Sequence, residues 1–462
     1  MTAVGPLDAM FLGGETREQP MHVGGLMLFE LPEGAGRDHV FPESSRDFVS
    51  RLYHEMLAAQ SVNPLFERRV RNRPQDLGYW SWEQDPHIDL EYHVRLSALP
   101  RPGRYRELFE LTSRLHGTLL DRHRPLWEMH LIEGVEGRRF ALYSKIHHSL
   151  IDGVTALRWM QDTLTTDPTR TDMPATYALP QSHEPVGAGA GRLPSVARLP
   201  VDAVKTFAGL AGLPLAGVKG LLQSTMPFQA PKTILNQAVT GARRFAAQSW
   251  PLERLEKVRA ITGATLNDVV LAMCSGALRN YLLELNALPD KSLTAMVPVS
   301  LRDRDGAPGG GNSLTTLIAD LATDQQDPER RIRRIMASTA QGKGVLSGLS
   351  PLQNLIVGAL GFGVAGPAAV LPGVAGRTTP PYNVVISNVP GPTESPLYWN
   401  RSRLLGMYPA SIVLNGQALN ISVISYDHQL HFGLIGDRRT VPHLQRMLGH
   451  LETSLADLEK IH

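Results

Sequence analysis

Residues 140–153 read Phe-Ala-Leu-Tyr-Ser-Lys-Ile-His-His-Ser-Leu-Ile-Asp-Gly, and this segment gives the clearest indication of the fold. Its first seven residues alternate as a β-strand does. Apolar residues with helical spacing then follow, at Val154, Leu157, Met160 and Leu164. The segment His147–Gly153 is therefore predicted to be a turn between a strand and a helix.

The two adjacent histidines of this turn are predicted to point in opposite directions, because successive residues leaving a strand do so. One of them can then face a cleft while the other supports the loop. Histidine suits proton transfer, since its unperturbed pKa near 6.5 leaves a neutral fraction at physiological pH. Asp152 is expected to fix the turn by accepting hydrogen bonds, and Gly153 permits a backbone conformation that a side chain would obstruct. A metal site is disfavoured, because neighbouring histidines cannot easily share an ion and no nearby Cys or Glu completes a set of ligands.

The chain on both sides of this turn reads as one α/β unit, from residue 1 to about residue 165. A strand is predicted at 22–31 and helices at 46–59 and 106–120. Trp127–Ile132 and Phe140–Ile146 are two strand-like runs joined by a Gly-containing link, which predicts a hairpin.

A second α/β unit is predicted from residue 235 to residue 462. It contains a helix at 265–288, with Thr265 as its N-cap and Asp268 three residues on, and a last helix at 444–461. Strand-like runs lie at 293–299, 314–321, 383–387, 419–426 and 430–435, and Asp427-His428 is the turn between the last two.

The segment between the two units, 166–234, is rich in Pro, Ala, Gly, Thr and Ser. Residues 185–194 are its most linker-like part, and 199–223 read as a mildly amphipathic helix lying on a surface. The sequence therefore predicts two α/β lobes of related design, with a ligand in the cleft between them.

Composition limits the classes of function. The 46 basic residues are balanced by 44 acidic ones, and no run of Lys or Arg indicates a nucleic-acid partner. The single cysteine, Cys274, excludes an internal disulfide and a multi-thiolate metal site. The N-terminal residues lack a basic region followed by an apolar one, so we expect no secretory signal and a place inside the cell.

Residues 344–376 form an uncharged segment of 33 residues. Its length would suffice to cross a bilayer, but repeated Gly and Pro residues are atypical of a spanning helix. We expect a buried or lipid-contacting segment.

With these features the chain resembles one family, the bacterial wax ester synthase/acyl-CoA:diacylglycerol acyltransferases, and most closely the actinobacterial triacylglycerol synthase type. The resemblance spans nearly the whole chain. It rests on Pro6-Leu7-Asp8-Ala9-Met10-Phe11, Pro125-Leu126-Trp127, His147–Gly153, Asn267-Asp268 and Ser387-Asn388-Val389-Pro390-Gly391-Pro392. The histidine motif alone is shared with a wider superfamily that includes chloramphenicol acetyltransferase and peptide-synthetase condensation domains.

The resemblance implies two chloramphenicol-acetyltransferase-like lobes with the active site between them and His148 as general base. It implies acyl transfer from acyl-CoA to diacylglycerol, and also to long-chain alcohols to give wax esters, without a cofactor. It further implies peripheral contact with the inner membrane or lipid droplets from the cytoplasm. The oligomeric state stays open.

The family pattern suggests further site residues, each with a structural alternative. Asn267, Ser387 and Asn388 are candidate oxyanion donors. Asn267 and Asp268 could instead only stabilise the start of a helix, and Pro390-Gly391-Pro392 could only redirect the chain. Pro125-Leu126-Trp127 resembles a motif associated with the acyl pocket, but a proline opening a strand before core residues explains it equally well.

Three other functions fit the sequence less well. The first is acyl transfer to another acceptor, or from a carrier-protein thioester, in complex-lipid assembly. The second is a non-catalytic lipid-binding protein, which the segment 344–376 suggests. The third is a hydrolase, although no Gly-x-Ser-x-Gly elbow is present and Cys274 falls inside an apolar helix.

Overall fold

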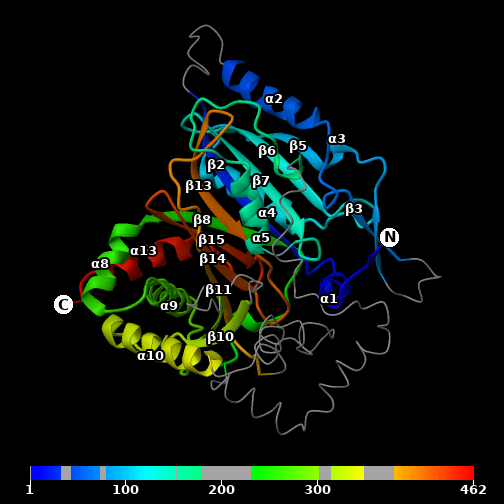
Figure 1. Ribbon diagram of the computed structural model, residues 1–462. Coiled ribbons are helices and arrows are strands. Elements are labelled where there is room, and N and C mark those ends of the chain that lie inside the picture. The colour runs from blue at the N-terminus through cyan, green and yellow to red at the C-terminus, as the bar shows by residue number, and fades with distance from the viewer. Residues whose placement is uncertain are drawn as a thin grey trace.

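The computed structural model describes residues 2–32, 43–72, 80–151, 153–178, 230–300, 314–347 and 379–461. Within these residues the chain forms two six-stranded sheets and a small three-stranded sheet, with helices packed around them (Figure 1). The predicted α/β class is confirmed.

The first sheet has the strand order β12-β13-β2-β7-β6-β5. Its central strands are β2 (His22–Glu30), β7 (Arg139–His147) and β6 (Trp127–Val135), and β5 (Val94–Ala98) lies at one edge. β6 and β7 are the predicted hairpin. Helices α2 (Glu43–Leu57), α4 (Tyr105–Gly117) and α5 (Gly153–Asp162) lie where helical spacing indicated them, and α3 (Leu90–His93) is a single turn before β5.

The second sheet has the order β10-β9-β11-β14-β15-β8. Its strands are β8 (Arg243–Pro251), β9 (Thr294–Ser300), β10 (Leu314–Asp320), β11 (Val384–Val389), β14 (Leu419–Tyr426) and β15 (Gln429–Asp437). Asp427 and His428 both have positive φ, 46° and 57°, which is the two-residue turn that matches strand twist in a hairpin.

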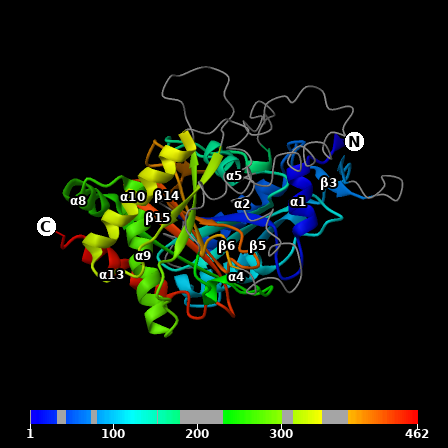
Figure 2. The same cartoon turned by 90° about the horizontal axis from the view of Figure 1, so that it is seen from below.

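Four helices cover this sheet: α8 (Leu252–Thr262), α9 (Leu266–Glu284), α10 (Pro328–Ser347) and α13 (Arg446–Leu458) (Figures 1 and 2). The central one, α9, begins at the predicted cap. It ends four residues before the predicted 288, because Asn286 takes a left-handed conformation. The amides of Asn286 and Ala287 then bond back to Leu283 and Leu282, which closes the helix end.

The second half of the chain contributes two strands to the first sheet. β12 (Tyr398–Trp399) and β13 (Ser402–Ala410) come from the second half of the chain, yet β13 pairs with β2 in the first sheet. Without β13, the buried strand β2 would present an unpaired edge. The sequence predicts a second lobe that contains all of residues 235–462. Two strands within that range, β12 and β13, instead belong to the sheet of the first lobe.

A smaller sheet lies beside the first lobe, with the order β1-β4-β3. Its strands are β1 (Thr2–Ala3), β4 (Ser81–Gln84) and β3 (Arg68–Arg71), and helix α1 (Pro6–Gly14) follows β1 (Figure 2). Short 3-10 turns lie at Thr176–Ala178 and Ile234–Asn236.

Parts of the predicted organisation lie outside the described residues. They include the linker 185–194, the amphipathic stretch 199–223 and most of the uncharged segment 344–376. Residues 344–347 form the last turn of α10. Among the described helices no single one is long and apolar enough to cross a bilayer, and α8 with α9 meets that test only as a pair bent by 102°.

Candidate active site

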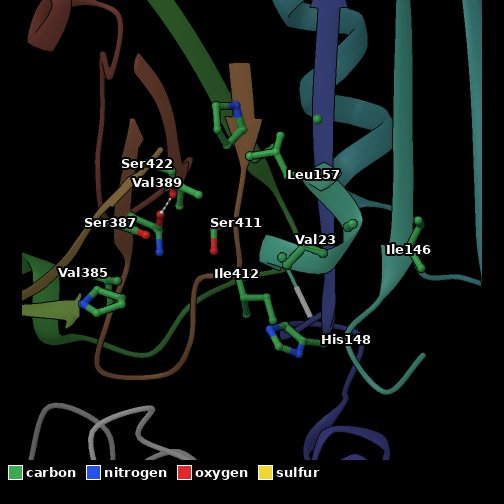
Figure 3. A pocket seen from close by; sticks show the side chains of 18 of the residues that line it. Val23, Ile146, His148, Leu157, Val385, Ser387, Val389, Ser411, Ile412 and Ser422 are labelled. Carbon is green, nitrogen blue, oxygen red and sulfur yellow. Dashed lines mark hydrogen bonds between the residues drawn. The ribbon is translucent and has the colours of Figure 1, made fainter. Parts of the chain in front are cut away.

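A cavity of about 840 Å³ lies between the two sheets (Figure 3). Its walls come from α1, β2, the end of β7, α5 and β13 on one side, and from β9, β11 and β14 on the other. Most of the lining is apolar, as in Phe11, Val23, Ile146, Leu157, Met160, Val385, Val389 and Met407. An apolar lining of this kind suits a hydrocarbon ligand.

His148 is the one histidine among the described residues that line this cavity. It follows directly on β7, and Ser144 and Ile146, on the same face of that strand, line the cavity as well. Its backbone amide donates to the carbonyl of Met21 at 2.9 Å. Its ring stacks on Phe11 with 4.2 Å between centroids. Met21 thus fixes the backbone of His148, while Phe11 of α1 packs against its ring.

His147 points the other way, as the alternation predicts, and is completely buried. The amide of Ser149 donates to its Nδ1 at 3.1 Å, so the ring proton of a neutral His147 is on Nε2. Nε2 lies 3.3 Å from Oε2 of Glu15, a close electrostatic contact whose angle falls short of a well-aligned hydrogen bond. His147 therefore joins the motif to the end of α1.

Glu15 is the residue of this site that sequence reasoning missed. Its Oε2 accepts the amide of Met21 at 3.1 Å, and its Oε1 accepts Arg122 Nε and Nη2, each at 3.1 Å. Burial alone would raise the pKa of the Glu15 carboxyl, but His147, the Met21 amide and Arg122 hold that pKa below its ordinary value. Met21 is the residue whose carbonyl holds His148, so Glu15 connects both histidines to α1.

A buried neutral histidine, His116, lies behind the cavity wall. Its Nε2 donates to the carbonyl of Ser411, a lining residue, at 3.0 Å, and its Nδ1 is 2.8 Å from the Tyr143 hydroxyl. Burial lowers the pKa of His116 to about 3. In the unfolded chain the pKa returns to about 6.5. Below pH 6.5 the unfolded state therefore binds a proton that the folded state does not, and stability falls as the pH falls.

This linkage predicts a change in the pH dependence of stability for His116→Gln, whose amide can replace both hydrogen bonds. Wild type should lose about 2 kcal/mol of unfolding free energy between about pH 7 and pH 5 through His116 alone. In His116→Gln this contribution should be absent, so the unfolding free energy measured in urea should fall by about 2 kcal/mol less over the same pH interval. The exposed His123→Gln is the control. An unchanged pH slope in His116→Gln would contradict a neutral, buried His116.

The oxyanion candidates separate into two groups. Ser387 and Asn388 lie on β11 and line the cavity. Figure 3 shows Ser387 across the cavity from His148. Asn267 lies in the first turn of α9 and is not among the lining residues. Asp268 is buried, forms the capping box with Thr265 and accepts the Thr339 hydroxyl at 2.7 Å, so its contacts fix the helix start. The catalytic role of each residue stays a prediction.

Pro125-Leu126-Trp127 lies at the start of β6, and none of the three lines the described cavity. Leu126 and Trp127 are buried. The Trp127 indole donates to the carbonyl of Phe66 at 2.8 Å and stacks between Tyr177 and His93. These contacts are those of core residues.

The remaining candidates are Asp152, Gly153 and Cys274. Asp152 lies outside the described residues. Gly153 begins α5 and lines the cavity. Cys274 is buried within α9, and burial raises the pKa of its thiol far above the ordinary value, which opposes the formation of a thiolate. The described part of the chain contains no cluster of three His, Cys, Asp or Glu residues arranged to bind a metal.

Comparison with known proteins first defines the class of fold. A condensation domain of a peptide antibiotic synthetase, the first of the CDA synthetase, matches all of this chain and 96% of its own with a TM-score of 0.53 at 15% identity. That likeness is one of fold alone. The wax ester synthase/diacylglycerol acyltransferase of Marinobacter aquaeolei VT8 is much closer, with a TM-score of 0.77 and 41% identity over 99% of both chains. The predicted two-lobed acyltransferase fold is confirmed.

The sequence comparisons give the family. The wax ester synthase/diacylglycerol acyltransferase catalytic domain matches residues 4–270, and the C-terminal domain of the same family matches residues 310–459. A Mycobacterium tuberculosis protein, provisionally named a diacylglycerol O-acyltransferase, is 50% identical over 98% of this chain and 99% of its own. The chain belongs to the wax ester synthase/diacylglycerol acyltransferase family and is an O-acyltransferase.

Proposed function

We propose that this enzyme moves a long-chain acyl group from acyl-CoA to the free hydroxyl of diacylglycerol, and also to long-chain alcohols, with His148 as general base. The observation that carries the proposal is the position of His148 in the wall of a mainly apolar cavity between the lobes. The names of the similar proteins support the same substrates.

In the proposed reaction the neutral imidazole of His148 accepts the proton of the acceptor hydroxyl. The alcohol oxygen attacks the thioester carbonyl, and the resulting tetrahedral oxyanion collapses with cleavage of the carbon–sulfur bond. Protonated His148 then returns its proton to the leaving thiolate, so that ester and free thiol form and the enzyme is restored. A base held in this way contributes about 10²- to 10⁴-fold in rate.

Ser387 and Asn388 are the better candidates for oxyanion donors. They line the same cavity as His148 but belong to the opposite sheet, so they can approach a thioester from the side away from the base. Asn267, which does not line the described cavity, is a weaker candidate.

Direct transfer, without an acyl-enzyme, is part of the proposal. Cys274 is fully buried in α9 and does not line the cavity. Among the described residues no histidine side chain bonds to the hydroxyl of a lining serine, and His116 contacts only the backbone carbonyl of Ser411. The reaction needs no cofactor, and we infer a cytoplasmic enzyme in peripheral contact with the inner membrane or lipid droplets.

An acceptor competition assay tests this function. Purified enzyme receives radiolabelled palmitoyl-CoA with dioleoylglycerol and hexadecanol, separately and together, and the products are separated by thin-layer chromatography. We expect triacylglycerol, and wax ester in the arm with hexadecanol. Thiol release without either ester would indicate a hydrolase.

A carrier-protein donor is the second candidate, and the same assay distinguishes it. Palmitoyl thioester on a phosphopantetheinylated acyl carrier protein replaces palmitoyl-CoA at equal concentration. Turnover with the carrier thioester alone would overturn the choice of acyl-CoA.

A further inference from the structure

We propose that the guanidinium of Arg158 binds the phosphate groups of the acyl-CoA donor, an inference that rests on the function proposed above. Arg158 lies on α5 and lines the cavity that contains His148. Among the described lining residues it is the only one with a permanent charge. All the others are apolar, uncharged polar, or His148 itself.

Within the described part of the chain Arg158 has no carboxylate within ion-pair distance and no hydrogen-bond partner, which distinguishes it from the other arginines near the site. Arg122 is paired with Glu15. Arg243 lies 3.6 Å from Asp437 and donates to backbone carbonyls. A guanidinium without a carboxylate partner at the wall of an apolar cavity is available to receive an anion. A guanidinium also matches phosphate oxygens in a bidentate geometry that no other side chain reproduces.

Arg158 lies further along the cavity than the histidine motif, on the helix that follows that motif. Helix α5 begins at Gly153, directly after the histidine motif, and Arg158 lies five residues further on, about 7.5 Å along the axis. In acyl-CoA the pantetheine arm separates the thioester from the phosphates. A thioester at His148 therefore needs its anion partner at a distance from the imidazole. Gln161, one turn after Arg158, also lines the cavity and can bond to the amides of that arm.

Binding measurements with three palmitoyl thioesters test the assignment. They carry CoA, 4′-phosphopantetheine and pantetheine, so that the number of phosphates falls to zero. Wild type, Arg158→Gln and Arg158→Lys are compared by titration calorimetry, with Arg114→Gln as the matched control, since Arg114 is exposed on α4 and does not line the cavity.

We expect Arg158→Gln to weaken palmitoyl-CoA binding by about 10- to 100-fold, the range for losing hydrogen bonds to a charged group. The affinity of Arg158→Lys for palmitoyl-CoA should lie between those of Arg158→Gln and wild type. Palmitoyl-pantetheine should bind all four proteins equally, and wild type should bind it more weakly than palmitoyl-CoA. Added salt should weaken only the binding of the phosphorylated thioesters.

Three results would overturn the proposal. In the first, the affinity for palmitoyl-CoA is unchanged in Arg158→Gln. In the second, the affinities for palmitoyl-CoA and palmitoyl-pantetheine fall by the same factor, so that Arg158 contributes to the cavity wall and not to phosphate binding. In the third, Arg158→Gln no longer binds vesicles that contain phosphatidylglycerol but still binds palmitoyl-CoA as wild type does. Arg158 would then bind the phosphate of a lipid headgroup. Because binding is measured without turnover, failure of the proposed acyl transfer is seen separately.

Discussion

Replacement of His148 by alanine is expected to lower kcat for triacylglycerol formation by about 10²- to 10⁴-fold. Without the imidazole, the acceptor hydroxyl has no base in the described cavity, where the other polar groups are hydroxyls, amides and the guanidinium of Arg158. The affinity for palmitoyl-CoA should change much less, because His148 acts on the acceptor proton. Initial rates with dioleoylglycerol, together with titration of palmitoyl-CoA, check both parts.

The matched control for this prediction is His123→Ala, which removes an imidazole whose side chain is 95% exposed. Circular dichroism confirms folding of both variants. Turnover in His148→Ala within about threefold of wild type would remove the general-base role.

Replacement of Glu15 by glutamine should have the second largest effect. It should lower both the free energy of unfolding and kcat. The amide keeps the shape but loses the charge that faces Arg122 and His147. Breaking a buried ion pair by removing one partner costs about 3–5 kcal/mol. We expect the lower end of that range, because the Arg122 side chain is 37% exposed while that of Glu15 is 3% exposed.

The same substitution should lower kcat, because the Met21 amide loses a charged acceptor while the Met21 carbonyl holds His148. Urea unfolding and initial rates are measured on Glu15→Gln and on the exposed control Glu136→Gln. Arg122→Met added to Glu15→Gln should cost less than the sum of the two single changes. Full additivity, or unchanged stability in Glu15→Gln, would contradict a coupled cluster.

The sequence predicts those parts of the fold that local patterns determine. The hairpin β6–β7, the cap of α9 and the turn at Asp427-His428 each depend on residues close together in the chain. The opposite directions of His147 and His148 follow from the same local rule, the alternation of a strand.

Long-range pairing is what the sequence leaves open. Strand β13 pairs with β2 across more than 370 positions in the chain, and no local pattern indicates which sheet it joins. Glu15 was missed for the same reason, since its partners Arg122 and His147 are brought together only by the fold. The motif Pro125-Leu126-Trp127 is recognisable in the sequence, but the sequence does not show whether its side chains face the cavity or the core.

The most direct test of the central claim, direct transfer by one cavity histidine, is rapid mixing of enzyme with palmitoyl-CoA while free thiol is recorded. Without an acceptor we predict no burst of thiol and an intact enzyme mass without added palmitate. With dioleoylglycerol present, thiol and triacylglycerol should appear at the same rate, and both rates should fall about 10²- to 10⁴-fold in His148→Ala. A burst of one thiol per enzyme without acceptor, with palmitate attached covalently to the chain, would contradict the account.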